Sequence, residues 1–345
     1  MNNPPNLTWL PYLRTLDDAY KSRPPIQYIV GGLFALPSLN VVYSPPGGLK
    51  SMILADMAIC VTSGIPWLER APWEMKPLKP FSVIQSPVLW LDFDNGSNRT
   101  SNRFEALGRE YKVPADAPLF YFSMPSPPLD ISKTGHVVDL IDIAKQLAAK
   151  LIVIDNLATI SGGRDENTSE MLVIMANLRL LSERTGAAVV PNHHSRKETG
   201  YKGKQGDNLR GFSGIRGAID TGLYIDRETN SDIVTIRAEK TRDVEIPPFG
   251  AVFTYTHKPG CNDLATARFY QVAVLGAETD QDIESAVIDA LKGAGTCLNQ
   301  TNLIKETKKS LKSGEKRIAD IINRMVARKV IKCSSGPRGS HVYTI

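Results

Sequence analysis

The chain has 345 residues, of which 42% are hydrophobic and 22% are charged, a globular composition that excludes a wholly disordered protein. No apolar run reaches the roughly 18 residues of a membrane-spanning helix, and the start of the chain lacks the basic and apolar regions of a secretory signal. The four cysteines form no CxxC pair, so neither a disulfide framework nor a zinc site is indicated, and we expect a cytoplasmic protein.

The net charge of +5 is unevenly distributed along the chain. Residues 281–345 hold 12 Lys/Arg and 6 Asp/Glu, a net charge of +6, which leaves the first 280 residues at −1. A basic tail on a near-neutral body is typical of a module that meets a polyanion. The alternative is an ordinary solvated helical surface.

In chain order, residues 1–38 are proline-rich and predicted to be irregular. A strand over 39–43 then leads into the turn 44–51 and an apolar helix that ends at Gly64. Four prolines between 66 and 80, and a fifth at 87, predict a surface loop because proline disrupts helices and central strands. Further strands are expected at 88–94, 119–124, 151–157, 187–192, 221–227, 232–240 and near 251–257, with helices at about 98–111, 136–149 and 168–186.

Strands that alternate with helices predict an α/β fold with a mainly parallel sheet and helices on both faces. The apolar runs at 88–91 and 151–154 suit strands that are buried on both sides. Near 276–280 the pattern changes to short basic helices. We therefore predict three parts, namely an N-terminal segment (1–38), an α/β domain (39–276) and a C-terminal domain (281–345).

The turn after the first strand approximates the phosphate-binding pattern GxxxxGK[ST], although Ser44 and Leu49 replace both of its glycines. Backbone N–H groups at such a turn bind phosphate oxygens. Lys50 would reach the β- and γ-phosphates, and the Ser51 hydroxyl would ligate Mg²⁺. The alternative is a Pro-Gly turn before a helix with an exposed lysine. The predicted ATP contacts are Pro46, Gly47, Gly48, Leu49, Lys50, Ser51 and Met52.

Acidic residues follow two of the predicted buried strands. Asp155 lies at the carboxyl end of its strand, where a phosphate-loop ATPase holds the aspartate that organises magnesium. The alternative is that Asp155 caps the following turn. Asp92 and Asp94 are two residues apart and would share one face of a strand, so that both approach the nucleotide. Asp94 could orient or deprotonate the attacking water, or it could instead cap the helix that starts near Asn98.

Together, the segments SPPGGLKS, LDFDNG, LIVIDNL, PNHHSRK and LRGFSGIRGAID resemble the RecA-type ATPases. More narrowly, they are similar to RepA-like hexameric helicases of phages, plasmids and mobile elements. The resemblance covers about residues 44–220. It implies a RecA-like core, ATP and Mg²⁺ as cofactors, and a homo-oligomeric ring, expected to be a hexamer, around single-stranded DNA.

The resemblance also implies roles for individual residues. Lys50 and Ser51 would bind triphosphate and magnesium, and Asp155 would be the Walker B acid. Asp94 occupies the position of the family's catalytic glutamate, and this shorter side chain places a high turnover rate in doubt. His193 and His194 match a γ-phosphate sensor, with a polar strand end as the alternative. Candidates for an arginine finger that acts on the neighbouring subunit are Arg210, Lys240 and Arg242.

Two basic regions are candidate DNA contacts. The glycine-containing stretch 195–208 could track a phosphate backbone in a ring channel, or it could be a surface loop without function. Residues 281–345 have an order of helices and strands that resembles a winged helix-turn-helix, with Ser313 as a candidate cap of its third helix. Such a module would bind duplex DNA or dock a replication partner protein. The candidate DNA-binding residues are Arg196, Lys197, Lys202, Lys204, Lys308, Lys309, Lys312, Lys316, Arg317 and Arg338.

The sequence thus predicts an ATP-hydrolysing DNA motor, a helicase of a phage or mobile element. The alternative is a non-motor, ATP-dependent DNA-binding switch in regulation, recombination or defence, because helicases and switches share the same phosphate chemistry. A nucleotide-binding scaffold without hydrolysis is a third hypothesis, based on the altered glycines and Asp94.

Overall fold

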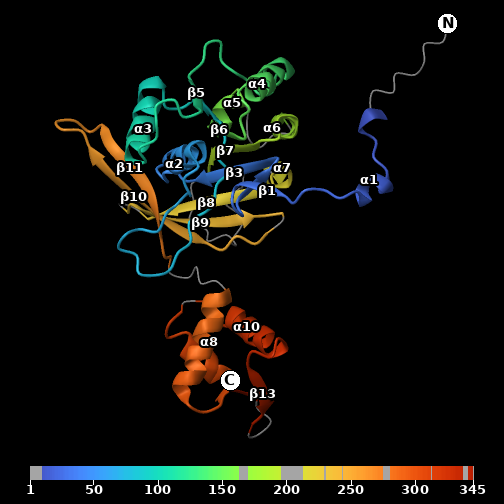
Figure 1. Cartoon of the computed structure of the whole chain (residues 1–345), viewed down its shortest axis with the longest axis vertical. Helices are drawn as coiled ribbons and strands as arrows, with labels where there is room; N and C mark the ends of the chain where they lie inside the picture. The colour runs from blue at the N-terminus through green and yellow to red at the C-terminus, as the bar shows by residue number, and fades with distance from the viewer. Residues whose placement is uncertain are drawn as a thin grey trace.

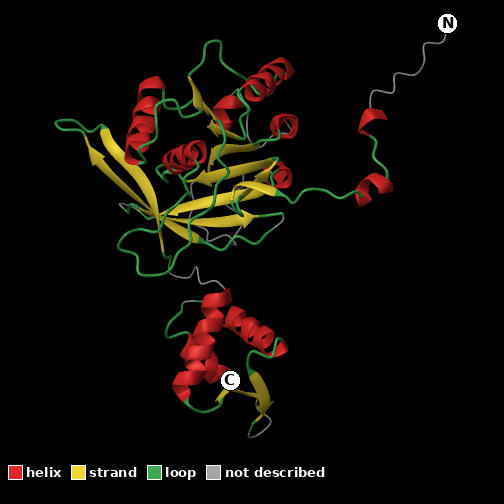
Figure 2. Ribbon diagram, in the orientation of Figure 1, coloured by secondary structure: helices red, strands yellow, loops and turns green. Residues whose placement is uncertain are grey.

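The computed structural model of the protein describes residues 10–162, 170–195, 213–228, 231–242, 244–274, 280–311, 313–336 and 341–344. Figure 1 shows a layered α/β body and, after it in the chain, a separate C-terminal body of helices and short strands. Figure 2 separates the strands of the large sheet from the helices that cover it.

The large sheet has nine strands in the order β11-β10-β9-β8-β3-β7-β6-β4-β5. Six of them run parallel and form the centre and one side of the sheet. The other three continue it as an antiparallel meander. The parallel strands are β3 (Ser38–Ser44), β4 (Val88–Asp92), β5 (Leu119–Ser123), β6 (Leu151–Asp155), β7 (Ala188–His194) and β8 (Thr221–Arg227), and the antiparallel strands are β9 (Ile233–Lys240), β10 (Phe249–His257) and β11 (Leu264–Val272).

Helices cover both faces of the sheet, as the alternating pattern predicts. The helices α2 (Lys50–Ser63) and α3 (Ser97–Glu110) share one apolar core with one face of the strands. The opposite core contains side chains of four other helices. These are α4 (Thr134–Gln146), α5 (Leu157–Ile160), α6 (Glu170–Thr185) and α7 (Ser213–Ala218).

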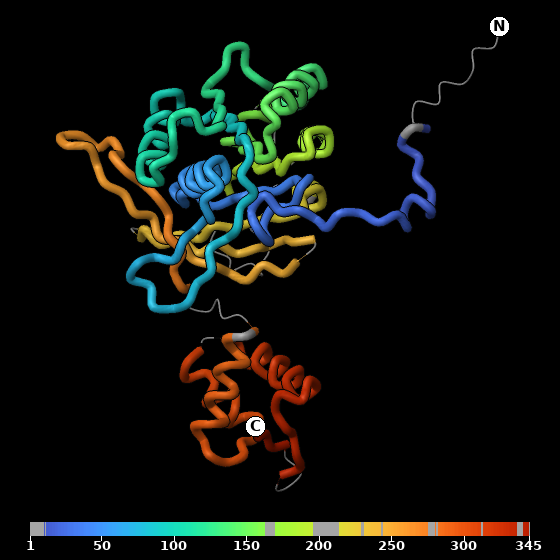
Figure 3. Tube along the Cα trace, in the orientation of Figure 1, coloured from blue at the N-terminus to red at the C-terminus, as the bar shows by residue number. Residues whose placement is uncertain are grey.

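The prediction that residues 1–38 are irregular is wrong for their second half. The strands β1 (Gln27–Val30) and β2 (Phe34–Leu36) form an antiparallel pair whose side chains Ile29, Val30 and Phe34 are buried in the core. Burial of these apolar groups stabilises a hairpin that proline content alone argued against. Before it, a 3-10 turn (Leu10–Tyr12) and the short helix α1 (Leu16–Tyr20) lie on a segment that Figure 3 shows leading away from the sheet.

A buried carboxylate ties the middle of α2 to the antiparallel part of the sheet. Asp56 is fully buried and accepts hydrogen bonds from Trp67 Nε1, the Tyr111 hydroxyl and the Phe269 backbone N–H, each at 3.0 Å. Burial raises the pKa of Asp56 to about 7, although these donors and the nearby Arg268 oppose the shift. Because β11 supplies the Phe269 donor, this acid also anchors a strand that the sequence did not predict.

The C-terminal body has a small core of its own. It consists of α8 (Asp280–Ala294), α9 (Gln300–Thr307) and α10 (Glu315–Ala327), with β12 (Leu298–Asn299), β13 (Lys332–Ser335) and β14 (His341–Thr344) paired in the order β12-β14-β13. Asn299 caps α9 through its side chain, as predicted. Ser313 does not cap α10, because Gly314 occupies that position and Ser313 is buried. No helix in the described part of the chain is long and apolar enough to cross a membrane.

Candidate nucleotide-binding site

The candidate site lies where the parallel strands end. The strands β3, β4, β6, β7 and β8 all run in one direction, so their carboxyl ends meet at the same edge of the sheet. A pocket of about 290 Å³ opens at this edge. Its lining residues come from the turn after β3, the first turn of α2, α3 and the ends of four strands: Gly47, Gly48, Leu49, Lys50, Ser51, Met52, Asp94, Arg103, Asp155, Asn192, His194 and Arg227.

The turn between β3 and α2 has the tight geometry of a phosphate loop despite its altered pattern. Gly47 has a φ of +80°, and a Cβ at Gly48 would lie 2.1 Å from the Ser44 hydroxyl oxygen, so neither position accommodates a larger residue readily. Leu49 has a φ of +62°, the left-handed conformation that usually favours glycine. Its partly buried side chain packs against the core, and this packing offsets the backbone strain.

Lys50 is 6% exposed and its ammonium group lies inside this turn. Its Nζ lies 3.2 Å from Ser44 Oγ and 3.4 Å from the Ser44 carbonyl oxygen. Burial lowers the pKa of Lys50, whereas the carboxylates of Asp155 and Asp94 act to raise it. The alternative of an exposed lysine after a simple turn is therefore not what the structure has.

Of the two histidines at the end of β7, only His194 lines the pocket. Its Nδ1 lies 3.3 Å from Lys50 Nζ, while His193 is buried at 5% exposure. Burial and the neighbouring Lys50 lower the pKa of His194, which favours the neutral ring at pH 7. Because the ammonium group can only donate, neutral His194 accepts at Nδ1 and carries its proton on Nε2, where it can donate to an anion.

Asp155 is 1% exposed and is held by two asparagine side chains that the sequence analysis did not single out. Asn192 Nδ2 donates to Asp155 Oδ1 at 2.6 Å and lies 3.4 Å from Ser51 Oγ, and Asn95 Nδ2 donates to Asp155 Oδ2 at 2.9 Å. Burial raises the pKa of Asp155, and the hydrogen bond from Asn192 counteracts this. Asn156, not Asp155, caps α5.

The prediction that Asp92 and Asp94 both face the nucleotide is wrong for Asp92. Asp92 is fully buried and accepts hydrogen bonds from Thr100 Oγ1 at 2.5 Å, from Ser123 Oγ at 2.7 Å and from backbone N–H groups. Burial alone would raise the pKa of Asp92, but these donors hold it below its usual value. Asp94 follows the strand, is exposed and lines the pocket, and Gly96 occupies the capping position of α3.

Two arginines of the pocket were also missed. Arg227, at the carboxyl end of β8, donates from Nη1 to the Gly47 carbonyl oxygen at 2.9 Å and so supports the phosphate loop. Arg103 lies on α3, and burial lowers its pKa while the facing Asp155 acts to raise it. Arg99 and Arg103 are one helical turn apart and line a larger, adjoining polar pocket of about 590 Å³. This i,i+4 spacing after the acidic strand end was the signal available in the sequence.

A profile of the AAA domain family matches residues 8–200, over half of the chain. The chain belongs to this AAA domain family. It is a P-loop ATPase of the RecA type, as its sequence motifs indicate. No curated protein matches it significantly.

Two solved structures are similar to this ATPase at low sequence identity. The ATPase domain of a helicase has 10% identity and a TM-score of 0.46, and the alignment covers 63% of this chain and 81% of that one. The RadB recombinase has 14% identity and a TM-score of 0.46, with 64% and 89% covered.

The family binds nucleotide, generally with Mg²⁺, and the donors present here fit that ion. The Ser51 hydroxyl and the Asp155 carboxylate are oxygen donors of the kind that Mg²⁺ prefers, with phosphate and water as its remaining ligands. In the described ranges no group of three or more His, Cys, Asp or Glu side chains could hold a metal by itself. A magnesium site in this ATPase would therefore depend on the phosphates.

The finger candidates of the ATPase lie away from this pocket. Lys240 and Arg242 are at the end of β9, opposite the start of β8, where their side chains donate to backbone carbonyls of α7. Arg210 lies outside the described residues, as do the predicted DNA contacts Arg196, Lys197, Lys202, Lys204, Lys312 and Arg338.

Proposed function

We propose that this ATPase is a ring-forming DNA motor, a RepA-like helicase that acts in the replication of a phage or mobile element. The observation that supports a ring is the distance between the finger candidates and the chain's own pocket. The strand β8 has its amino end beside Lys240 and its carboxyl end, Arg227, in the pocket. Seven residues of strand span about 20 Å, so a cation at that end can reach only a neighbouring subunit's ATP.

In the proposed reaction, the turn 44–51 binds the triphosphate through backbone N–H groups and Lys50. Lys50 neutralises the charge that develops on the β- and γ-phosphoryl oxygens. Ser51 and Asp155 hold Mg²⁺, which supplies further charge neutralisation on the phosphates. Asp94 orients the attacking water, and His194, which contacts Lys50, detects the γ-phosphate through its Nε2 proton. Arg103 is near enough to both acids to stabilise the same charge.

We further propose that the C-terminal body is a winged helix-turn-helix that binds duplex DNA or a replication partner protein. Its three helices and three-stranded sheet support this assignment. Of its candidate phosphate contacts, Lys308 pairs with Glu315 at 3.1 Å, Lys309 with Glu306 at 2.6 Å and Arg317 with Asp280 at 3.1 Å. Exposed ion pairs of this kind are weak, so phosphate can displace them. Lys316 is exposed.

The second candidate function is a non-motor, ATP-dependent DNA-binding switch. Asp94 favours it, because an aspartate reaches less far toward the attacking water than a glutamate and suits slow hydrolysis. Strand displacement on a forked duplex, with ATPase rates measured with and without single-stranded DNA, separates the two functions. A motor displaces the strand and is stimulated by DNA. A switch binds DNA in an ATP-dependent way without displacement, and Lys50→Ala is the inactive control for both.

Charge reversal in the full chain tests the role of the C-terminal body. The triple change Lys308→Glu, Lys309→Glu and Lys316→Glu should weaken duplex binding across sequences and flatten its salt dependence, because fewer counterions are released. The ATPase rate without DNA should not change, since these residues lie in a body with its own core. Unchanged DNA binding would instead favour a protein-docking role.

A further inference from the structure

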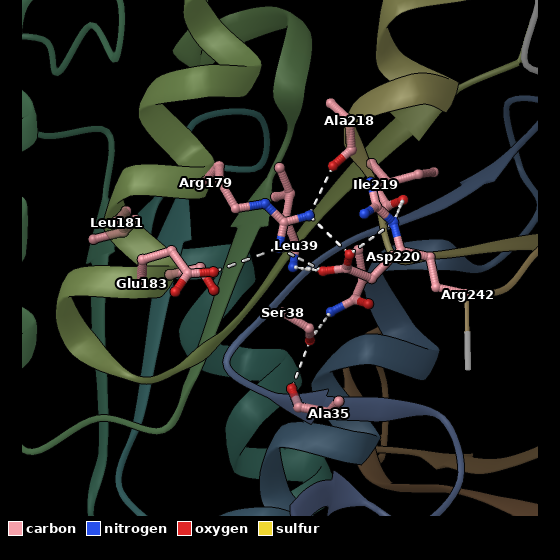
Figure 4. Close-up of polar contacts among 12 residues, drawn as sticks. Ala35, Ser38, Leu39, Arg179, Leu181, Glu183, Ala218, Ile219, Asp220 and Arg242 are labelled. Carbon is pink, nitrogen blue, oxygen red and sulfur yellow. Dashed lines mark hydrogen bonds and ion pairs between the residues drawn. The ribbon is translucent and has the colours of Figure 1, made fainter. Parts of the chain in front are cut away.

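We propose that Asp220, held by Arg179, positions Arg242 as the residue that acts on the neighbouring subunit's ATP. This inference rests on the ring proposed above and selects one of its three finger candidates. Figure 4 shows the arrangement, with Arg179 and Arg242 on either side of the Asp220 carboxylate. Asp220 and Arg179 would be positioning residues, since neither reaches a phosphate itself.

Asp220 is fixed to the central strand of the sheet. Its backbone N–H donates to the Leu39 carbonyl oxygen at 2.7 Å, and its Oδ2 accepts from the Leu39 N–H at 2.8 Å. Leu39 belongs to β3, the strand that ends at the phosphate loop. The carboxylate therefore has a defined position relative to the chain's own ATP site, and its side chain is only 16% exposed.

The two arginines bind this carboxylate differently. Arg179, from α6, makes two parallel contacts, Nη1 to Oδ2 at 2.6 Å and Nη2 to Oδ1 at 2.9 Å, and also donates to the Ala218 carbonyl oxygen. Arg242 contacts Asp220 only through Nε, at 3.1 Å from Oδ1, and its side chain is 50% exposed against 28% for Arg179. A bidentate pair is the stronger and more rigid of the two, so Arg179 is the permanent partner.

This difference allows Arg242 to leave without exposing an uncompensated charge. If the Arg242 guanidinium turns toward a phosphate, Asp220 keeps both contacts with Arg179 and the contact with the Leu39 N–H. Losing the only partner of a buried carboxylate is costly, but here a second partner remains. The Nε and Nη2 contacts to Asp220, Ile219 and Gly217 also keep the guanidinium in one place before a neighbour arrives. Pre-positioning of this kind lowers the cost of binding a phosphate.

The nearby Lys240 is the weaker candidate. Its ammonium group donates to the carbonyl oxygens of Arg216 and Gly217, and burial and the charge of Arg242 lower its pKa. A guanidinium remains charged and offers a planar fork that matches phosphate oxygens, which an ammonium group does not.

The test measures steady-state ATPase kinetics of full-length variants. Arg242→Ala should lower kcat by about a thousandfold, as loss of an arginine finger does. Asp220→Asn should lower kcat by about tenfold, as loss of an orienting partner does, and leave the KM for ATP unchanged. Glu183→Gln is the matched control, because Glu183 approaches Arg179 only from its exposed side, at 4.0 Å. It should behave as the wild type.

Mixing of subunits separates a trans role from a structural one. Asp155→Asn subunits have an intact finger and an inactive site, so mixing them with Asp220→Asn subunits should restore turnover at the latter's sites. The double variant Asp220→Asn/Arg242→Ala should be no slower than Arg242→Ala alone, because both changes remove one function. If Asp220→Asn does not fold, Arg179→Lys, which keeps the charge and loses the fork, carries the same test.

The outcomes distinguish this inference from the proposed function. If Arg242→Ala retains full turnover, Arg242 is not the finger, and the inference falls with that part of the proposal. If Arg242→Ala is inactive and rescued by mixing, but Asp220→Asn turns over normally, the ring stands and the inference is overturned. If Asp220→Asn loses activity that mixing does not restore, Asp220 acts within its own subunit and the inference is likewise overturned.

Discussion

The first turn of α2 and the middle of the same helix each involve a buried carboxylate, but only one of the two has an open side. At the first turn, Asp155 is held by the amides of Asn192 and Asn95 and borders a pocket. In the middle of the helix, Asp56 is enclosed by two aromatic side chains and a backbone N–H. A buried acid is thus structural where rigid donors surround it, and available for chemistry where its donors leave one direction open.

The largest effect should come from removing the cation at the open end. Lys50→Ala should lower ATP turnover by at least about a thousandfold, because it removes the charge that stabilises the transferring phosphoryl group. Steady-state hydrolysis measures this effect, with Lys145→Ala, an exposed lysine of α4, as the control. Unchanged hydrolysis in Lys50→Ala would remove the phosphate-loop assignment.

At the enclosed acid, the expected effect is on stability and depends on pH. The folded-state pKa of Asp56, about 7, lies above its ordinary value of 3.8, so the native state retains a proton that the unfolded state has lost. The stabilisation is complete below about pH 4 and is lost as the pH rises through 7, by at most about 4 kcal/mol. Urea unfolding from pH 4 to 8 measures it, and Asp56→Asn should abolish this part of the pH dependence. An equal dependence in Asp56→Asn would contradict the prediction.

The amide donors of the open acid offer a smaller effect. Asn192→Ala should lower kcat by about tenfold to a hundredfold, since it removes the group that orients Asp155 beside Ser51. It should also move the acid limb of the pH–rate profile upward, because loss of a donor to the carboxylate raises the pKa of Asp155 further. Asn177→Ala, whose amide binds the Ile131 carbonyl oxygen outside the pocket, should change neither quantity.

The smallest effect concerns the left-handed residue that precedes α2. Leu49→Gly and Leu49→Ala both lose the packing of the leucine side chain, but only glycine relieves the backbone strain. Leu49→Gly should therefore be more stable than Leu49→Ala by about 1 kcal/mol, measured by thermal unfolding. Equal stabilities would mean that the turn changes conformation when the side chain is removed.

The sequence predicted the parts of the site that follow from local pattern. A strand, a small-residue turn and Lys-Ser identified the phosphate loop, and an acid after an apolar run identified Asp155. The residues that it missed act across the sheet. Arg103 looks like any cation on a polar helix, and Arg227 stands 180 positions from the Gly47 carbonyl that it contacts. The strand β11 was missed because its partly buried, mixed sequence has no continuous apolar run.

The strand β8 has contacts of different kinds at its two ends. At its carboxyl end, Arg227 holds the loop that surrounds the chain's own phosphates. Just before its amino end, Asp220 holds Arg242. In a ring closed by Arg242, this strand would be the shortest covalent path from one ATP to the next, and a shift of the phosphate loop would need to travel only seven residues to alter hydrolysis next door. The order in which subunits fire would then be set by the stiffness of one short strand.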